Sequence, residues 1–130
     1  MNISKFTQKS VQAVQDLEKV AYQFGNQEIE EEHLLYALLE QEDSLILKLI
    51  EKMEIDSDVF LAQVEGAVRK RPQVQGGQVY IGQDLNKVLV YAENEAKALG
   101  DEYVSVEHLF LSLLRKPSKE IKQLFHDFQI

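Results

Sequence analysis

The chain has 130 residues, a formal net charge of −8 and no cysteine. That length suffices for one domain with an apolar core, and the lack of cysteine excludes disulfides, thiolate metal sites and thiol catalysis, which suits a reducing compartment. The acidic balance disfavours nucleic acid as a partner. Because no apolar run reaches the roughly twenty residues of a membrane span and the N-terminus has no signal-peptide core, we expect a cytoplasmic protein without a membrane partner.

Apolar residues recur at spacings of three and four along most of the chain, which predicts helices with one buried face. Thr7 can cap the first helix and Gly25 can end it, and Asp56 or Ser57 can cap the fourth, which Pro72 closes. The other helices are predicted at residues 31–41, 44–53, 83–99, 105–116 and 118–128. No strand is predicted. Residues 72–81 contain a proline and paired glycines without helical periodicity, so they are interpreted as a connector and as the most flexible segment.

An internal duplication organises these helices. The stretch NQEIEEEHLLYALL, which begins at Asn26, returns as DEYVSVEHLFLSLL from Asp101, and an ungapped offset of 75 residues pairs many identical residues. Each copy of such a repeat needs the other to cover its apolar face. We therefore expect one domain over residues 1–130, with a first repeat at about 6–71, the connector at 72–81 and a second repeat at about 82–130. The second repeat lacks its last helix, which suggests a piece of a longer protein.

A Glu-His pair occurs in both repeats, as Glu32-His33 and Glu107-His108. His and carboxylate are common in metal sites and acid–base pairs, but neither copy forms His-Glu-x-x-His, and neighbouring residues point to different faces of a helix. We predict that each His caps or bridges backbone groups under its helix start. A metal-dependent hydrolase built on the two pairs remains the alternative from another functional class.

Other catalytic patterns have no support in the sequence. The glycines near the connector are not followed by the Lys-Ser/Thr of a nucleotide loop, and no Ser lies in a Gly-x-Ser-x-Gly setting. We predict that these 130 residues have no catalytic activity.

The helix predicted at residues 83–99 has more apolar residues than its upstream counterpart. Val90 and Tyr91 lie outside its apolar stripe, where the first repeat has Gln15 and Asp16. One interpretation is an exposed groove between the repeats that binds polypeptide segments. The other is that the connector covers these side chains.

Four motifs together resemble a known family. They are Phe6-Thr-Gln-Lys-Ser, the two Glu-His-Leu helix starts, Arg71-Pro-Gln-Val-Gln-Gly, and Gly100-Asp-Glu-Tyr-Val-Ser-Val-Glu-His-Leu. The chain resembles, over essentially its whole length, the N-terminal domain of ClpB-type disaggregases. The resemblance implies an all-α fold in which two tandem helical repeats pack with pseudo-two-fold symmetry.

The resemblance also implies a function. In the family this domain is a mobile module on a hexameric AAA+ ring, where it captures exposed apolar or unfolded segments and passes them on, in cooperation with a DnaK-type chaperone system. Its cofactors, ATP and Mg, belong to AAA+ modules outside these residues, so none is expected here. The alternative is the adaptor-binding N-domain of a protease-partnered ClpC/ClpA-type unfoldase.

The resemblance places functional residues at specific positions of this chain. The polar ones fall on Thr7, Asp101 and Glu107, and the apolar groove falls on the second repeat. Together with Tyr91 from the apolar excess, the expected substrate-binding residues are Thr7, Leu85, Val88, Leu89, Tyr91, Asp101, Glu107 and Leu109. Gly82 departs from the family pattern, because a second Thr or Ser cap is common at that position.

Overall fold

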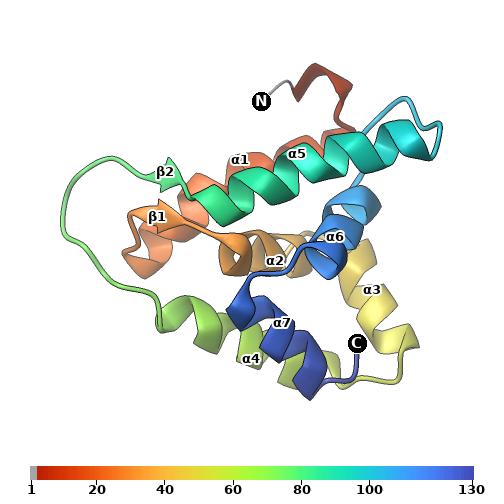
Figure 1. The fold of residues 1–130 in the computed structure, drawn as a ribbon. Coiled ribbons are helices and arrows are strands. Elements are labelled where there is room, and N and C mark those ends of the chain that lie inside the picture. The colour runs from red at the N-terminus through yellow and green to blue at the C-terminus, as the bar shows by residue number, and fades with distance from the viewer. Residues whose placement is uncertain (1–2) are drawn as a thin grey trace.

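The computed structural model describes residues 3–130, and within them it forms seven α-helices (Figure 1). A short 3₁₀ helix at Ile3–Lys5 precedes them. The α-helices are α1 Gln8–Phe24, α2 Glu31–Leu39, α3 Leu45–Lys52, α4 Ser57–Arg69, α5 Gln83–Ala98, α6 Val106–Arg115 and α7 Lys119–Asp127. Each predicted helix is confirmed, and its ends differ from the prediction by no more than a few residues.

Side-chain caps explain most helix starts. The side-chain oxygens of Thr7, Asp56, Ser105 and Ser118 accept hydrogen bonds from backbone amides in the first turns of α1, α4, α6 and α7. Such a cap satisfies an amide that has no partner within the helix. Gly25 ends α1 in the left-handed conformation that glycine adopts most readily, with a φ of 72°.

The prediction that the chain has no strand is wrong. Two two-residue strands, β1 Glu28–Ile29 and β2 Tyr80–Ile81, pair in parallel, and Phe6 forms an isolated bridge with Val104. The amide of Gly82 donates to the carbonyl of Ile29 at 2.8 Å, and the amide of Thr7 donates to that of Val104 at 2.9 Å. Segments this short leave no alternation to read in the sequence.

These pairings also confirm the symmetry of the fold. Adding the offset of 75 to Phe6 and Ile29 gives Ile81 and Val104, so the same contact is made twice with the repeats exchanged. Helix packing follows the same rule, because α1 packs on α2 and α6 while α5 packs on α6 and α2. The two repeats therefore share one core.

The core contains matched residues from both repeats. Leu34 and Leu109 are completely buried, as are Leu38 and Leu113. No helix within residues 3–130 combines the length and the apolar character that crossing a membrane would need.

The two repeats differ in what covers their outer face. In the first repeat α4 packs on α2, and Phe24, at the end of α1, lies edge-on to Tyr36 with ring centroids 5.3 Å apart. Phe24 is 6% exposed, whereas its counterpart Leu99 is 60% exposed. Among the residues that the structure describes, the second repeat has no helix that corresponds to α4.

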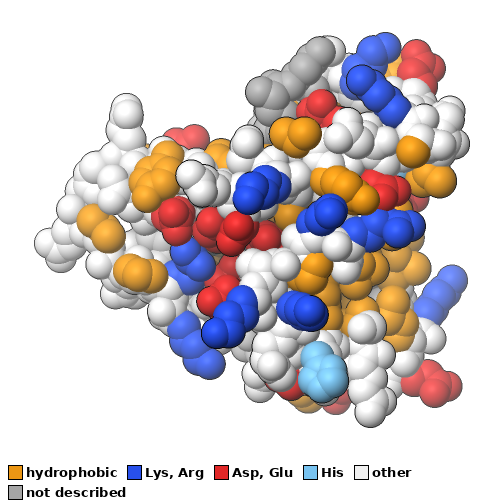
Figure 2. All heavy atoms as spheres, viewed as in Figure 1, with side chains coloured by type: hydrophobic (Ala, Val, Ile, Leu, Met, Phe, Trp, Pro, Cys, Tyr) orange, Lys and Arg blue, Asp and Glu red, His pale blue; other side chains and the backbone are white. Residues whose placement is uncertain are grey.

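Figure 2 shows hydrophobic side chains gathered in a hollowed region beside α6, α3 and α7.

The glycines at the ends of α1 and α5 provide a stability test of the repeat. Gly25 and Gly100 have φ values of 72° and 76°, and an added Cβ at either position would meet no atom closer than 3.7 Å. Changing either to Ala should therefore cost about 1 kcal/mol of unfolding free energy through backbone strain alone. Gly66→Ala, inside α4 with open space around it, is the control and should stabilise the chain by about 0.5–1 kcal/mol. Urea unfolding measures all three, and an unequal cost at Gly25 and Gly100 would contradict their equivalence.

Candidate functional site

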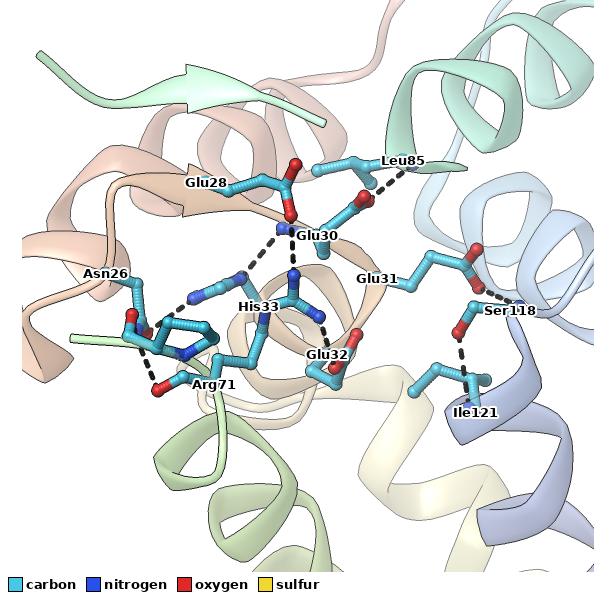
Figure 3. A network of polar contacts seen from close by, with 11 residues as sticks. Asn26, Glu28, Glu30, Glu31, Glu32, His33, Arg71, Leu85, Ser118 and Ile121 are labelled. Carbon is cyan, nitrogen blue, oxygen red and sulfur yellow. Dashed lines mark hydrogen bonds and ion pairs between the residues drawn. The ribbon is translucent and has the colours of Figure 1, made fainter. Parts of the chain in front are cut away.

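In the first repeat the arginine that directly precedes the connector fills a polar site (Figure 3). We call it the Arg71 site and define it by Asn26, Glu28, Glu32, His33 and Arg71. Arg71 Nη2 lies 2.6 Å from Glu28 Oε1, and Nη1 lies 3.0 Å from Glu32 Oε2. The Glu32 side chain is 3% exposed, so the guanidinium supplies the charge partner that a buried carboxylate needs.

Backbone contacts hold the residues around Arg71 against the first repeat. Asn26 Nδ2 donates to the carbonyl of Pro72 at 3.1 Å, and the amide of Val74 donates to the carbonyl of Gly25 at 2.9 Å. The guanidinium of Arg69 lies over the Phe24 ring, 5.0 Å from its centroid. The first part of the connector is thus fastened across the end of α1, and the flexibility of residues 72–81 stays a prediction.

The two histidines act as structural caps, as predicted. His33 Nδ1 accepts from the amide of Glu30 and His108 Nδ1 accepts from the amide of Ser105, both at 2.9 Å. Since Nδ1 accepts, Nε2 carries the proton, and it reaches Asn26 Oδ1 at 2.9 Å in the first repeat and Asp101 Oδ2 at 2.8 Å in the second.

The environment of His33 keeps its ring neutral. Burial, with a further contribution from the charge of Arg71, lowers the pKa of His33 to about 4. A neutral His33 donates to Asn26, which in turn donates to Pro72, so the helix cap and the connector belong to one hydrogen-bond chain.

Glu30 caps α5 in place of the Thr or Ser that the family commonly has at the position of Gly82. Gly82 begins α5 without a side-chain cap, and Glu30 Oε1, from the other repeat, accepts from the amide of Leu85 at 2.8 Å. A Cβ on Gly82 would collide with the Glu30 carboxylate, so a Thr or Ser cap there would require the Glu30 side chain to move away. Burial raises the pKa of Glu30, although the hydrogen bond from Leu85 opposes the rise.

Glu31 links the start of α2 to the start of α7. Its Oε1 accepts from the amide of Ser118 at 2.9 Å, and the residue is 1% exposed. Burial raises the pKa of Glu31 to about 8, against the lowering effect of that hydrogen bond. Acidic side chains gather over β1 and the start of α2 on the face shown in Figure 2.

The counterpart of the Arg71 site in the second repeat is open, and we call it the second-repeat hollow. It has a volume of about 490 Å³ and is lined by Leu99, Asp101, Glu102, Tyr103, Ser105, Glu107, His108 and Leu111. By the offset of 75, Asp101 takes the place of Asn26, Tyr103 that of Glu28 and Glu107 that of Glu32. Hollows of similar volume occur elsewhere on the surface, for example beside β2. The second-repeat hollow differs from the hollow beside β2 because it has an equivalent in the same chain, the Arg71 site, which the Arg71 side chain occupies.

Of the three expected polar site residues, the structure places two in the second-repeat hollow and one elsewhere. Asp101 and Glu107 line the second-repeat hollow, as does His108, which the sequence indicated only as a cap. Thr7 lies instead at the start of α1, where its side chain accepts from the amide of Ser10 and its own amide donates to Val104.

The expected apolar groove residues do not reach the surface. Leu85, Val88, Leu89 and Leu109 are at most 2% exposed, because the stripe of α5 packs against α6 in the shared core. The prediction of an exposed groove is corrected for these four residues. Tyr91 is partly exposed beside Lys116, whose Nζ lies 5.0 Å from the ring centroid, and Val90 is 49% exposed, so the connector does not bury this pair.

Sequence reasoning missed Arg71, Leu99, Tyr103 and Leu111. The offset of 75 contained a signal for the last three, because it pairs Leu99 with Phe24, Tyr103 with Glu28 and Leu111 with Tyr36. The exposure of the second-repeat residues depends on α4, which packs on α2 and has no described counterpart on α6. Arg71 was missed because its contact with Glu32 spans 39 residues.

Comparisons with known proteins agree with this geometry. The family model described as the Clp repeat (R) N-terminal domain matches residues 5–128. The chain belongs to the Clp N-terminal domain family. This Clp N-terminal domain is 43% identical over 126 residues to the chaperone protein ClpB of Nitratidesulfovibrio vulgaris, an alignment that covers 93% of this chain and 15% of that protein. The domain thus spans about a sixth of the length of its curated relatives.

Solved structures show the same fold. The N-terminal domain of Hsp104 from Candida albicans matches with a TM-score of 0.86 at 22% identity, over 98% of this chain and 83% of that one. A ClpV N-domain in complex with a VipB peptide matches with a TM-score of 0.76 at 20% identity, over 97% of this chain and 80% of that one.

Because the pKa of Glu31 is raised, we predict that the free energy of unfolding of this Clp N-terminal domain depends on pH. Between the ordinary value of 4.5 and about 8, the folded chain holds a proton that the unfolded chain has lost. The stability contributed by Glu31 is therefore complete below pH 4.5 and declines as the pH rises to about 8. Glu31→Gln keeps the acceptor for Ser118 without the ionisation.

Urea unfolding at pH 5 and pH 8 measures this effect. Glu31→Gln should gain about 1 kcal/mol or more relative to the wild type between the two pH values. The exposed Glu18→Gln is the control and should show no such gain. Parallel stability curves for the wild type and Glu31→Gln would contradict the buried, protonated carboxyl.

Proposed function

We propose that this domain recruits unfolded or aggregated polypeptides and passes them to the AAA+ ring of a ClpB-type disaggregase. The observation that supports the proposal best is the composition of the second-repeat hollow. Leu99 is 60% exposed and Tyr103 is 47% exposed, and both lie beside the carboxylates of Asp101 and Glu107. An exposed apolar surface with a polar rim is typical of a protein-binding site.

The hollow suits weak and general recognition. Its apolar walls can contact hydrophobic side chains that folded proteins bury, and its shallow shape places few geometric demands on a partner. A module that hands polypeptides to a motor has to release them, so we expect dissociation constants of roughly micromolar, about −8 kcal/mol.

The relatives support the rest of the proposal. ClpB chaperones are about six times longer than this chain, and we assign ATP and Mg, the hexameric ring and cooperation with a DnaK-type chaperone to that additional length. The 130 residues then contribute binding and no catalysis, in the cytoplasm. That a ClpV N-domain of the same fold forms a complex with a VipB peptide is consistent with peptide binding here. Similarity to ClpB proteins favours this function over adaptor binding in a ClpC/ClpA-type unfoldase.

A substitution at the hollow tests the proposal. Leu99→Asp places a charge on its apolar wall, at a position too exposed to affect the core. It should weaken binding of a permanently unfolded, reduced and alkylated model protein at least fivefold, as measured by fluorescence anisotropy.

Val59→Asp is the matched control. Val59 lies on α4, outside the lining of the hollow, and is 48% exposed, so the same substitution there should leave binding unchanged. Circular dichroism should show native helix content in both variants. Equal binding by Leu99→Asp and the wild type would remove the hollow from the client-binding site.

A further inference from the structure

We propose that a strip of lysines on the second repeat binds short acidic segments of a partner polypeptide. The lysine strip consists of Lys116 at the end of α6, Lys119 and Lys122 at the start of α7, and Lys87 on α5. These residues are all exposed. They do not line the second-repeat hollow, so the lysine strip goes beyond the proposed function and does not depend on it.

Local geometry brings these lysines together. Lys119 follows Lys116 after only two residues, and Lys122 is its neighbour on one face of α7, three positions along. Lys116 Nζ lies 5.0 Å from the centroid of the Tyr91 ring, and Lys87 lies four positions before Tyr91 on the same face of α5. Figure 2 shows Lys and Arg side chains over α5, the end of α6 and the start of α7.

The ammonium groups of the lysine strip are not neutralised within the chain. The ion pairs formed within residues 3–130 do not include Lys87, Lys119 or Lys122. Lys116 contacts the Tyr91 ring, which holds the cation in place without cancelling its charge. The neighbouring Arg115 differs, because its Nε lies 3.0 Å from Glu95 Oε1. The strip therefore presents unpaired positive charge at the surface.

The first repeat shows that the fold does not require these lysines. At the positions of Lys87, Lys116, Lys119 and Lys122, the offset of 75 places Gln12, Gln41, Ser44 and Leu47. Gln12 and Gln41 line a hollow of the first repeat, whose charged lining residues are Lys9, Asp16, Glu40 and Glu42. Most of that charge is negative. The two repeats therefore carry opposite charge on equivalent surfaces, which the shared core does not demand.

Helix electrostatics also count against a purely structural role. Lys119 is the first residue of α7 and Lys122 lies one turn later. The start of a helix carries partial positive charge, so a lysine there is unfavourable, whereas the exposed Glu120 is favourable. Glu31 and the Ser118 side chain already accept from amides at this helix start, so the site is formed by the lysines. An unfavourable charge without a partner is typical of a functional position.

Charge favours a short acidic peptide over a nucleic acid. Asp84 lies three positions before Lys87 on α5, and together with Glu28 it lines the hollow beside β2. A long polyanion that extends past Lys87 would meet these carboxylates, whereas a segment of a few acidic residues would contact the lysines alone. Ammonium groups are compact charges that impose little geometry, so the strip suits carboxylates at varied spacing. A second copy of this chain would bring its own net charge of −8 and be repelled.

The probe is a rhodamine-labelled hexapeptide of sequence Glu-Asp-Gly-Glu-Asp-Gly. The control peptide is Gln-Asn-Gly-Gln-Asn-Gly, which keeps the shape of the side chains and removes their charge. Anisotropy titration with the 130-residue chain should show saturable binding of the acidic peptide and at least tenfold weaker binding of the amide peptide. Raising the salt concentration from about 50 to about 300 mM should weaken the acidic peptide at least fivefold, because exposed charges are screened.

A pair of double variants assigns the binding to the strip. Lys119→Gln with Lys122→Gln should weaken the acidic peptide at least fivefold. Lys19→Gln with Lys52→Gln removes two exposed lysines from the first repeat and changes the net charge equally, so it should leave binding unchanged. The variant at Lys119 and Lys122 should unfold in urea no earlier than the wild type, because it removes cations from a helix start. A marked loss of stability would show that these lysines support the fold and would contradict the site.

Other occupants give different outcomes. Equal binding of the two peptides, or equal binding by the two double variants, would overturn the lysine strip as a site for acidic segments. Tighter binding of an oligothymidylate of the same formal charge would overturn it in favour of nucleic acid. Dimerisation in sedimentation velocity that the variant at Lys119 and Lys122 abolishes would overturn it in favour of a second copy. Leu99→Asp should bind the acidic peptide as the wild type does, so failure of the proposed function would leave the lysine strip standing.

Discussion

The ion pair between Arg71 and Glu32 is the interaction on which the asymmetry of this domain depends. Glu32 is almost fully buried, and one of its oxygens, Oε1, has no hydrogen-bond partner among the residues described. A buried carboxylate without a cation is costly, so the pair fastens the connector to the first repeat. One repeat thereby closes its own site, whereas the other leaves the same position, Glu107, exposed.

The duplication sets the limits within which the repeats could diverge. Core residues and short strands of each repeat contact the other repeat, so a change there affects both halves. Residues at the outer face make no contacts of this kind. Divergence is found there, where Tyr103 replaces Glu28 and Leu99 replaces Phe24. In addition, α4 packs on α2, whereas no helix among the described residues takes the same place on α6. A binding surface could thus change without disturbing the fold.

Local chemistry explains what the sequence predicted correctly. Helix starts depend on caps such as Thr7 and Ser118, and these act within three or four residues, so the sequence shows them directly. The histidine caps also act within one turn. The offset of 75 extended this local reading to the shared core, because identical apolar residues at both positions indicate two equivalent environments.

Contacts between distant segments explain what the sequence did not show. The parallel pairing of Ile29 with Ile81 and the capping of α5 by Glu30 each join residues more than fifty positions apart. The apolar excess of α5 indicated a groove because periodicity cannot distinguish a residue that faces a partner from one that faces the core. Val88 and Leu89 are buried by α6, and the accessible apolar surface lies instead at Leu99 and Tyr103.

A double-mutant cycle between Arg71→Gln and Glu32→Gln measures the central interaction most directly. The unfolding free energies of the wild type, both single variants and the double variant give the coupling between the two side chains. We predict a coupling of about 1–3 kcal/mol, larger than that of the more exposed pair Arg115 and Glu95 measured in the same way. A coupling near zero would contradict the account, because the connector would then not be held in the first repeat by this pair.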